Sequence, residues 1–328
     1  MTYRFLMTAP TLAVAGRRLL EEAGCSVVYL GGAAGPDASE NVDEVARLMG
    51  EHAFDAVISR TVTLSAAAIA ACPTLKVISK HGVGVTNIDV AAATARGIPV
   101  YTTPATNAQS VAELTLGLML AVARRLTFFD RELRAGRWTR TGDGVELAGR
   151  RLGLVGFGQI GQRVARFAQA LGMEVGFFDP ALPADVVPEG ATRYADLHDL
   201  LAVSDVLSLH CPVTPATRGL LGAAALARLP AGAIVLNTSR GELIDETALA
   251  AALESGHLAG AGLDTFLVEP LPEGHPFTRL PNVVTTPHVG GSTPAALDAV
   301  SISAVRNCLG FLDGAPVDRR ACVNPETL

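Results

Sequence analysis

The segment Gly156-Phe157-Gly158-Gln159-Ile160-Gly161 decides the fold of this chain. It follows an apolar run at 151–155 and precedes a helix-like run at 162–171, which gives the order strand, glycine turn, helix. The first glycine permits the tight turn, the second lets the backbone approach a diphosphate, and the third lets helix and strand pack closely. The diphosphate would lie on the helix N-terminus. The pattern predicts a dinucleotide site, with a structural glycine turn as the alternative.

An acidic residue follows the glycine turn at the distance that such a site requires. A second apolar run at 174–178 ends in Asp179, about twenty residues after the turn. A carboxylate there can accept hydrogen bonds from the hydroxyls of the adenine ribose, and it would repel a 2′-phosphate. Asp179 therefore favours NAD over NADP, and the alternative is an aspartate that only caps the turn.

The size and composition of the chain indicate two globular domains. The chain has 328 residues, of which 49% are hydrophobic and 18% charged, enough apolar residues for two buried cores. The net charge of -6 argues against nucleic acid or an anionic membrane as partner. The N-terminal residues 1–7 are too short for a signal peptide and read as a first strand, and the apolar stretch 111–122 contains Glu113 and is too short to span a membrane. We expect a cytoplasmic protein.

The cysteine and histidine patterns predict free thiols and no metal site. The five cysteines are odd in number, and none forms a CxxC pair. None of the seven histidines forms an HxxxH or HExxH pattern.

Strand-like and helix-like runs alternate along the chain, which is typical of parallel α/β architecture. The predicted strands are Phe5–Thr8, Ser26–Leu30, Ala56–Ser59, Lys76–Ser79, Arg151–Val155, Glu174–Phe178, Val206–Leu209, Ala233–Leu236, Gly260–Leu263 and Val283–Thr286. The predicted helices are Leu12–Ala23, Asp43–His52, Ser65–Ala71, Asn87–Gly97, Ser110–Ala135, Gln162–Leu171, Asp196–Val203, Ala223–Leu229, Asp245–Ser255 and Pro294–Leu312.

The position of the glycine turn in the middle of the chain suggests an inserted domain. We predict two Rossmann-like domains with parallel sheets: a substrate domain of residues 1–103 and 291–328, and an inserted NAD-binding domain of residues 104–290. A cleft between two such domains is an expected place for cofactor and substrate to meet.

Three polar segments follow late strands, at the sheet edge where open α/β folds build their sites. They contain Arg240, Glu269 and His288. An arginine can grip a carboxylate and polarise a carbonyl, and a histidine is suited to move a proton near neutral pH. A carboxylate behind the histidine would orient the ring and favour the imidazolium. Each residue alone could be structural, but the three together beside a nicotinamide site predict catalysis.

These segments belong to a wider pattern that resembles a known family. The chain is similar, nearly from end to end, to the D-isomer-specific 2-hydroxyacid dehydrogenases, particularly the phosphoglycerate dehydrogenase and hydroxypyruvate reductase branch. The resemblance rests on residues 80–89, Asn107 with 110–113, the glycine turn, 237–241, Glu269-Pro270 and Pro287-His288. It implies a homodimeric NAD-dependent oxidoreductase that interconverts a D-2-hydroxy acid and its 2-oxo acid.

The resemblance also assigns roles to individual residues. It implies that Arg240 holds the substrate carboxylate and carbonyl, that His288 is the acid–base group and that Glu269 supports it. The backbone of Val83 and Gly84 would help bind the carboxylate, as a small anion nest can. The implied cofactor contacts are Gly156, Gly158, Gln159, Ile160, Gly161, Asp179, Cys211, Thr238, Ser239 and Asp264, with Asp264 on the nicotinamide amide.

Basic residues near the expected substrate raise the question of a second anionic group. Arg60 follows a strand, Lys80 precedes the Val83-Gly84 loop, and Arg140 lies in a segment after the long predicted helix. Similar positions in phosphoglycerate dehydrogenases meet the substrate phosphate, the counterpart of Arg140 from the partner subunit. The alternative is ordinary solvated charge.

A different class of protein stays open at this point. Non-catalytic NAD-sensing dimers of the corepressor type share this fold and retain the Arg, Glu and His pattern. A compact chain without disordered recruiting arms makes that alternative less expected. Formate dehydrogenases also resemble this family, but they carry Gln where this chain has Glu269.

Overall fold

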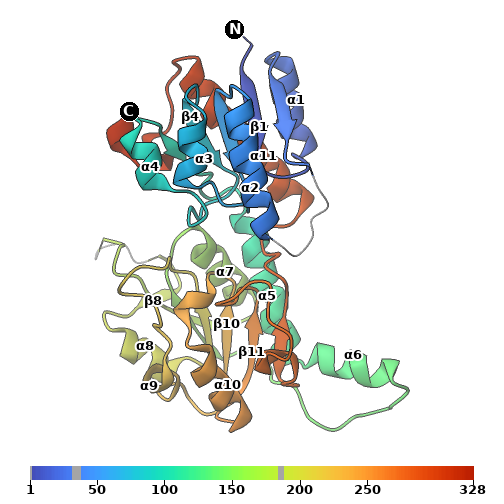
Figure 1. The fold of residues 1–328 in the computed structure, drawn as a ribbon. Coiled ribbons are helices and arrows are strands. Elements are labelled where there is room, and N and C mark those ends of the chain that lie inside the picture. The colour runs from blue at the N-terminus through green and yellow to red at the C-terminus, as the bar shows by residue number, and fades with distance from the viewer. Residues whose placement is uncertain (1, 32–37, 184–187) are drawn as a thin grey trace. The chain divides into compact units, whose positions relative to one another are not determined.

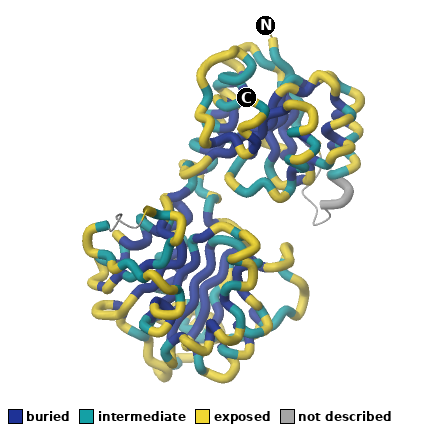
Figure 2. Tube along the Cα trace, turned by 90° about the vertical axis from the view of Figure 1, so that its left-hand side faces the viewer, coloured by how far each residue is buried: buried dark blue, intermediate teal, exposed yellow. Residues whose placement is uncertain are grey.

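The computed structural model describes residues 2–31, 38–183 and 188–328, so Met1 of the predicted first strand lies outside the described residues (Figure 1). The chain forms two compact units. Unit 1 comprises Met1–Asn107 and Ser292–Leu328, and unit 2 comprises Ala108–Gly291. Figure 2 shows that the buried residues are concentrated in the central sheet of each unit.

Unit 1 is a parallel five-stranded sheet with the order β2-β1-β3-β4-β5. Its strands are β1 (Arg4–Met7), β2 (Ser26–Tyr29), β3 (Ala56–Ser59), β4 (Val77–Lys80) and β5 (Val100–Tyr101). Its helices are α1 (Val14–Glu22), α2 (Ala38–Glu51), α3 (Ala66–Ala71), α4 (Val90–Ala95) and α11 (Pro294–Leu312). One core joins α1 and α11 to the sheet, and a second core joins α2, α3 and α4 to its other face. Strands β3 and β4 are apolar and buried along their whole length because helices cover both faces.

Helix α11 is long and apolar enough to cross a membrane by length and composition alone. In unit 1 it packs against α1 and β4, and Val300, Ala304, Val305 and Cys308 on it are buried. One side of the helix therefore belongs to the core of unit 1.

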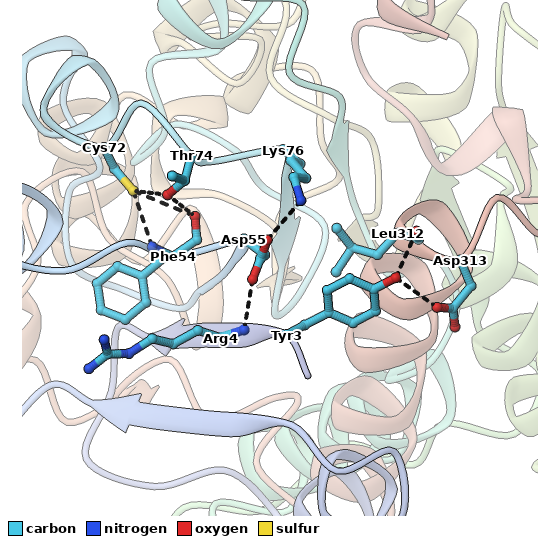
Figure 3. Close-up of polar contacts among 9 residues, drawn as sticks. All are labelled: Tyr3, Arg4, Phe54, Asp55, Cys72, Thr74, Lys76, Leu312 and Asp313. Carbon is cyan, nitrogen blue, oxygen red and sulfur yellow. Dashed lines mark hydrogen bonds and ion pairs between the residues drawn. The ribbon is translucent and has the colours of Figure 1, made fainter. Parts of the chain in front are cut away.

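Polar contacts join the starts of the strands in unit 1 (Figure 3). Asp55 accepts hydrogen bonds from the backbone N–H of Arg4 and from Nζ of Lys76, both at 2.9 Å. The Tyr3 hydroxyl donates to the Leu312 carbonyl oxygen at 3.0 Å. These bonds fasten β1 to the segment before β3 and to the end of α11.

Unit 2 is a parallel seven-stranded sheet with the order β12-β11-β10-β9-β6-β7-β8. Its strands are β6 (Arg151–Val155), β7 (Glu174–Phe178), β8 (Ala191–Arg193), β9 (Val206–Leu209), β10 (Ala233–Asn237), β11 (Leu258–Leu263) and β12 (Val283–Thr285). Its α-helices are α5 (Ala108–Ala123), α6 (Leu126–Arg134), α7 (Gln159–Ala170), α8 (Leu197–Val203), α9 (Ala223–Leu226) and α10 (Glu246–Glu254). Helices α5 and α7 share one core with the sheet, and α8, α9 and α10 share the other.

The predicted α/β class with two parallel sheets is confirmed. The single long helix predicted from Ser110 to Ala135 is wrong. The helix ends at Ala123 and a second one starts at Leu126, because Arg125 adopts a left-handed conformation with φ of 52°. Its guanidinium then lies 4.3 Å from the centre of the Phe128 ring, a cation–π contact that compensates part of the backbone strain. The short strands β5 and β8, each at an edge of its sheet, were not predicted.

Candidate active site

The glycine turn lies between β6 and α7 and has the shape that a diphosphate requires. Gly156 has φ of 93°, and a Cβ on it would lie 2.7 Å from the His210 carbonyl. A Cβ on Gly161 would lie 2.4 Å from the Gly156 oxygen, whereas a Cβ on Gly158 would meet no atom within 4 Å. Packing therefore requires glycine at positions 156 and 161, whereas Gly158 faces open space. Gly158 caps α7 without a side-chain hydrogen bond, which leaves the first N–H groups of the helix for an anion.

Asp179 is fixed directly beside this turn. Its Oδ2 accepts a hydrogen bond from the N–H of Phe157 at 2.8 Å, and its Oδ1 accepts one from the N–H of Ala181 at 2.9 Å. Each carboxylate oxygen retains capacity for a further donor, such as a ribose hydroxyl. The turn and this carboxylate together fit a dinucleotide.

Cys211 follows β9, which pairs with β6, and Thr238 and Ser239 follow β10, the next strand beyond β9. The Ser239 hydroxyl donates to the Cys211 carbonyl oxygen at 2.8 Å. The Oγ1 atoms of Thr238 and Thr115 are 2.8 Å apart, a buried contact that the sequence did not predict. Burial raises the pKa of Cys211 to about 11, so its side chain remains a thiol. Gln159 and Ile160 form the first turn of α7.

Glu269 and His288 form a hydrogen-bonded pair. Nδ1 of His288 lies 2.7 Å from Oε2 of Glu269, and Oε1 of Glu269 accepts the N–H of Phe266 at 3.0 Å. Partial burial opposes the charged form of Glu269, but the hydrogen bonds from His288 and Phe266 and the nearby charges of His288 and Arg240 outweigh it. They hold the pKa of Glu269 below its usual value. Glu269 is therefore a carboxylate at neutral pH, and Arg240 is close enough to stabilise that charge.

The loop that carries His288 is organised by Asp264, which is 1% exposed. Oδ1 of Asp264 accepts the hydroxyl of Thr286 at 2.6 Å and the N–H of Val289 at 2.9 Å, and Oδ2 accepts the N–H of Gly290 at 2.8 Å. These bonds surround His288, whose left-handed φ of 54° is sparsely populated for a residue with a side chain. The structure thus gives Asp264 a loop-holding role that the sequence did not suggest, and Thr286 shares it.

Arg240 is held at the end of β10 by its neighbours. The Asn237 side chain donates to the Arg240 carbonyl oxygen at 2.8 Å and accepts from the N–H of Ser239 at 3.0 Å. A Cβ on Gly241 would lie 2.0 Å from the Phe266 carbonyl carbon, so only glycine lets the Glu269 loop pack here. The structure therefore brings Arg240, Glu269 and His288 together within unit 2.

The predicted substrate contacts Arg60, Lys80, Val83 and Gly84 all lie in unit 1. Lys80 is 8% exposed, and its ammonium donates to the Arg60 carbonyl oxygen and to Oδ1 of Asn87. It therefore ties the end of β4 to the segment after β3.

Arg60 is half-buried near His81. Burial first, and then the charges of Arg60 and Lys80, lower the pKa of His81 to about 4, so that ring is neutral at physiological pH. Arg140 lies in unit 2, exposed on the segment after α6.

Comparison with known proteins identifies the family. Residues 116–290 match the model of the "D-isomer specific 2-hydroxyacid dehydrogenase, NAD binding domain". The chain is 42% identical over 267 residues to hydroxypyruvate reductase of Thermotoga maritima, covering 80% of this chain and 86% of that protein. It is 43% identical over 246 residues to D-3-phosphoglycerate dehydrogenase of Mycobacterium leprae, covering 74% of this chain but only 46% of that protein.

A solved structure extends the likeness to the whole chain. The TT0316 protein from Thermus thermophilus superposes with a TM-score of 0.87 at 38% identity, covering 98% of this chain and 99% of that one. The predicted family, enzyme class and NAD cofactor are confirmed, and the relatives favour the enzyme over the corepressor alternative. The chain belongs to the D-isomer specific 2-hydroxyacid dehydrogenases, a family of NAD-dependent oxidoreductases.

Proposed function

We propose that this protein interconverts a D-2-hydroxy acid and its 2-oxo acid, with His288 as the acid–base group and Arg240 as the carboxylate ligand. The observation that carries the proposal is the 2.7 Å contact between Nδ1 of His288 and Oε2 of Glu269, close to the Arg240 charge. A histidine oriented by a carboxylate and placed beside an arginine suits proton transfer to a carbonyl whose acid group is held.

The bound cofactor supplies hydride in the reducing direction. Gly158, Gln159 and Ile160 would hold its diphosphate through their N–H groups, and Asp179 would hold the adenine ribose. Because Glu269 accepts the proton on Nδ1, Nε2 of His288 is left to exchange a proton with the substrate oxygen. In reduction the imidazolium gives that proton to the carbonyl oxygen and becomes neutral, with Nδ1–H still bonded to Glu269. Arg240 binds the carboxylate and polarises the carbonyl.

An assay of NADH oxidation tests this function. The panel is 3-phosphohydroxypyruvate, hydroxypyruvate, glyoxylate, pyruvate and sulfopyruvate, and we expect turnover of at least one of these 2-oxo acids. NADH binding without turnover of any of them would instead favour the corepressor-type NAD sensor.

Glu269→Gln should shift the pH profile while retaining part of the activity. The neutral amide no longer stabilises the imidazolium, so His288 gives up its proton at lower pH. Reduction needs the imidazolium, and its alkaline limb should therefore move to lower pH. Oxidation needs the neutral ring, and its acid limb should move the same way. The measurement is kcat against pH in both directions, and unmoved limbs would show that Glu269 does not set the protonation of His288.

We further propose that Arg60 binds a second anionic group on the substrate, such as a phosphate, sulfonate or carboxylate. Among the described residues, no carboxylate lies within ion-pair distance of Arg60. Its backbone is fixed by bonds from N–H to Oγ1 of Thr8 at 2.9 Å and from Lys80 to its carbonyl oxygen. Lys80 would add its charge to the same anion site, and the N–H groups of Val83 and Gly84 would bind the carboxylate that all 2-oxo acids share.

Arg60→Ala should discriminate between substrates. A charge-assisted hydrogen bond contributes about 1.5–3 kcal/mol, so KM for an anionic-tailed substrate should rise roughly 10- to 100-fold, while KM for glyoxylate hardly changes. Arg18→Ala is the matched control, because Arg18 is an exposed arginine of unit 1 paired with Glu22. Equal losses on both kinds of substrate would assign Arg60 a structural role.

We propose that the protein is a homodimer that uses the segment around α6. Figure 1 shows α6 and the chain after it extending away from the sheet of unit 2, and no residue of α6 is buried. Leu126, Leu133 and Trp138 are 54%, 57% and 82% exposed, which is costly for large apolar side chains unless a partner covers them. Arg140 follows these residues.

Sedimentation velocity should give twice the chain mass, and Trp138→Ala should weaken the dimer. A monomer at micromolar concentration would refute this proposal.

We also infer a cytoplasmic location. All five cysteines are free, as expected in a reducing compartment. Fractionation of the source cells tests this, and recovery in the membrane or secreted fraction would contradict it.

A further inference from the structure

The loop 264–270 places Glu269 against His288, yet its tip has little hydrophobic anchoring. Leu267 and Val268 are each 56% exposed. Apolar side chains that remain in water contribute little packing, so hydrogen bonds must fix the tip. Glu269 holds one end of the loop itself, through the bond from the N–H of Phe266 to Oε1.

A second carboxylate holds the tip from the neighbouring helix. Glu246 is the first residue of α10, and its Oε1 accepts the N–H of Leu267 at 2.8 Å. Its Oε2 lies 3.3 Å from Nε2 of His275, and the side chains of His275 and Glu246 are 17% and 16% exposed. Glu246 thus joins the start of α10, the Glu269 loop and the segment that contains His275.

The contacts of His275 define its tautomer. The N–H of Phe277 donates to Nδ1 of His275 at 3.3 Å, so Nδ1 carries no proton and the proton of the neutral ring is on Nε2. That N–H points to the Glu246 carboxylate. Phe277 is 2% exposed in the core of unit 2, and its ring centre lies 4.7 Å from that of His275. The chain of contacts therefore runs from the core through His275 to Glu246 and the loop tip.

We propose that Glu246, oriented by His275, is a positioning residue that keeps Glu269 in contact with His288. Leu267 lies between Phe266, which donates to Glu269, and Glu269 itself. If the N–H of Leu267 lost its bond to Glu246, the carboxylate of Glu269 could move away from the imidazole of His288. A displacement near 1 Å at a reacting pair costs up to about a hundredfold in rate. Glu246 would act through Glu269, by way of its bond to the N–H of Leu267. This inference rests on the proposed role of the Glu269–His288 pair.

The experiment compares three substitutions at this contact in the full-length protein. Glu246→Ala removes both bonds and should lower kcat for reduction about tenfold and move its alkaline limb to lower pH, as Glu269→Gln does. Glu246→Gln keeps an oxygen that accepts the N–H of Leu267 and should restore most of the activity. His275→Asn retains an acceptor for the N–H of Phe277 but does not reach Glu246, so its effect should be intermediate. Glu254→Ala, an exposed carboxylate on the same helix, should behave like the unchanged protein.

The double variant separates positioning from general damage to the fold. Glu246→Ala added to Glu269→Gln should produce no further movement of the alkaline limb, because the carboxylate it positions is already absent. A fall in kcat with an unmoved limb, or additive movements of the limb, would overturn the inference.

If Glu269→Gln itself leaves the limb in place, the proposed pairing with His288 fails first. If Glu269→Gln moves the limb and Glu246→Ala does not, only the role of Glu246 fails. NADH titration and Tm report whether each variant is folded.

Discussion

His288→Ala should lower kcat by about a thousandfold, the middle of the range for general acid–base catalysis, while the Kd for NADH stays within about threefold. The substitution removes the group that exchanges a proton with the substrate oxygen. The ring of His288 is hydrogen-bonded to Glu269. The hydrogen bond between Phe157 in the glycine turn and Asp179 does not involve His288 and should be kept in the variant. Steady-state kinetics and a fluorescence titration with NADH measure the two quantities.

The backbone at this position requires a matched control. His288 has φ of 54°, where alanine is more strained than asparagine. His288→Asn should fold with a Tm close to that of the unchanged protein and still lose the same turnover, because an amide cannot transfer a proton near neutral pH. Near-normal turnover in His288→Asn would remove His288 from the acid–base role. A parallel loss of NADH binding in both variants would show a general collapse of the loop.

The glycine turn could be predicted because its requirements are local. The left-handed φ of Gly156 and the close contact at Gly161 follow from neighbours within one strand, one turn and one helix. The break at Arg125 could not be predicted in this way. No glycine or proline marks the break, and its stabilisation depends on a guanidinium over the ring of Phe128.

In the candidate site, too, the contacts that depend on residues distant in the sequence could not be predicted. The strand-end positions of Glu269 and His288 suggested a common site, but the 2.7 Å contact depends on a loop conformation that Asp264 holds from a different strand end. Lys80 is a basic residue beside a predicted anion loop, which indicated substrate binding. Its bonds to the Arg60 carbonyl oxygen and to Asn87 could not be predicted, because they depend on the ends of β3 and β4 lying side by side. From the sequence one can predict which residue types lie at the edge of a sheet. The partners of each side chain depend on the conformations of the loops, which the sequence pattern does not give.

Asp179 should make the protein prefer NADH to NADPH. Asp179 receives the N–H groups of Phe157 and Ala181 on its two oxygens, so it cannot easily rotate away from the glycine turn. A 2′-phosphate placed on the adenine ribose would meet this fixed negative charge. Repulsion of like charges in a partly desolvated site costs a few kcal/mol, so kcat/KM should be on the order of a hundredfold higher with NADH than with NADPH.

Asp179→Asn tests whether the charge itself makes this choice. The amide oxygen can still accept the N–H of Phe157, while the negative charge is lost. The ratio of kcat/KM for NADH to kcat/KM for NADPH should fall toward about ten, mainly through a lower KM for NADPH, because the amide no longer repels the phosphate. Arg193 lies nearby and donates to the Asp179 carbonyl oxygen at 3.0 Å, so the strand end keeps its support in the variant. Equal kcat/KM for both cofactors in the unchanged protein would refute the role of Asp179. A ratio that does not respond to Asp179→Asn would place the discrimination in another part of the turn.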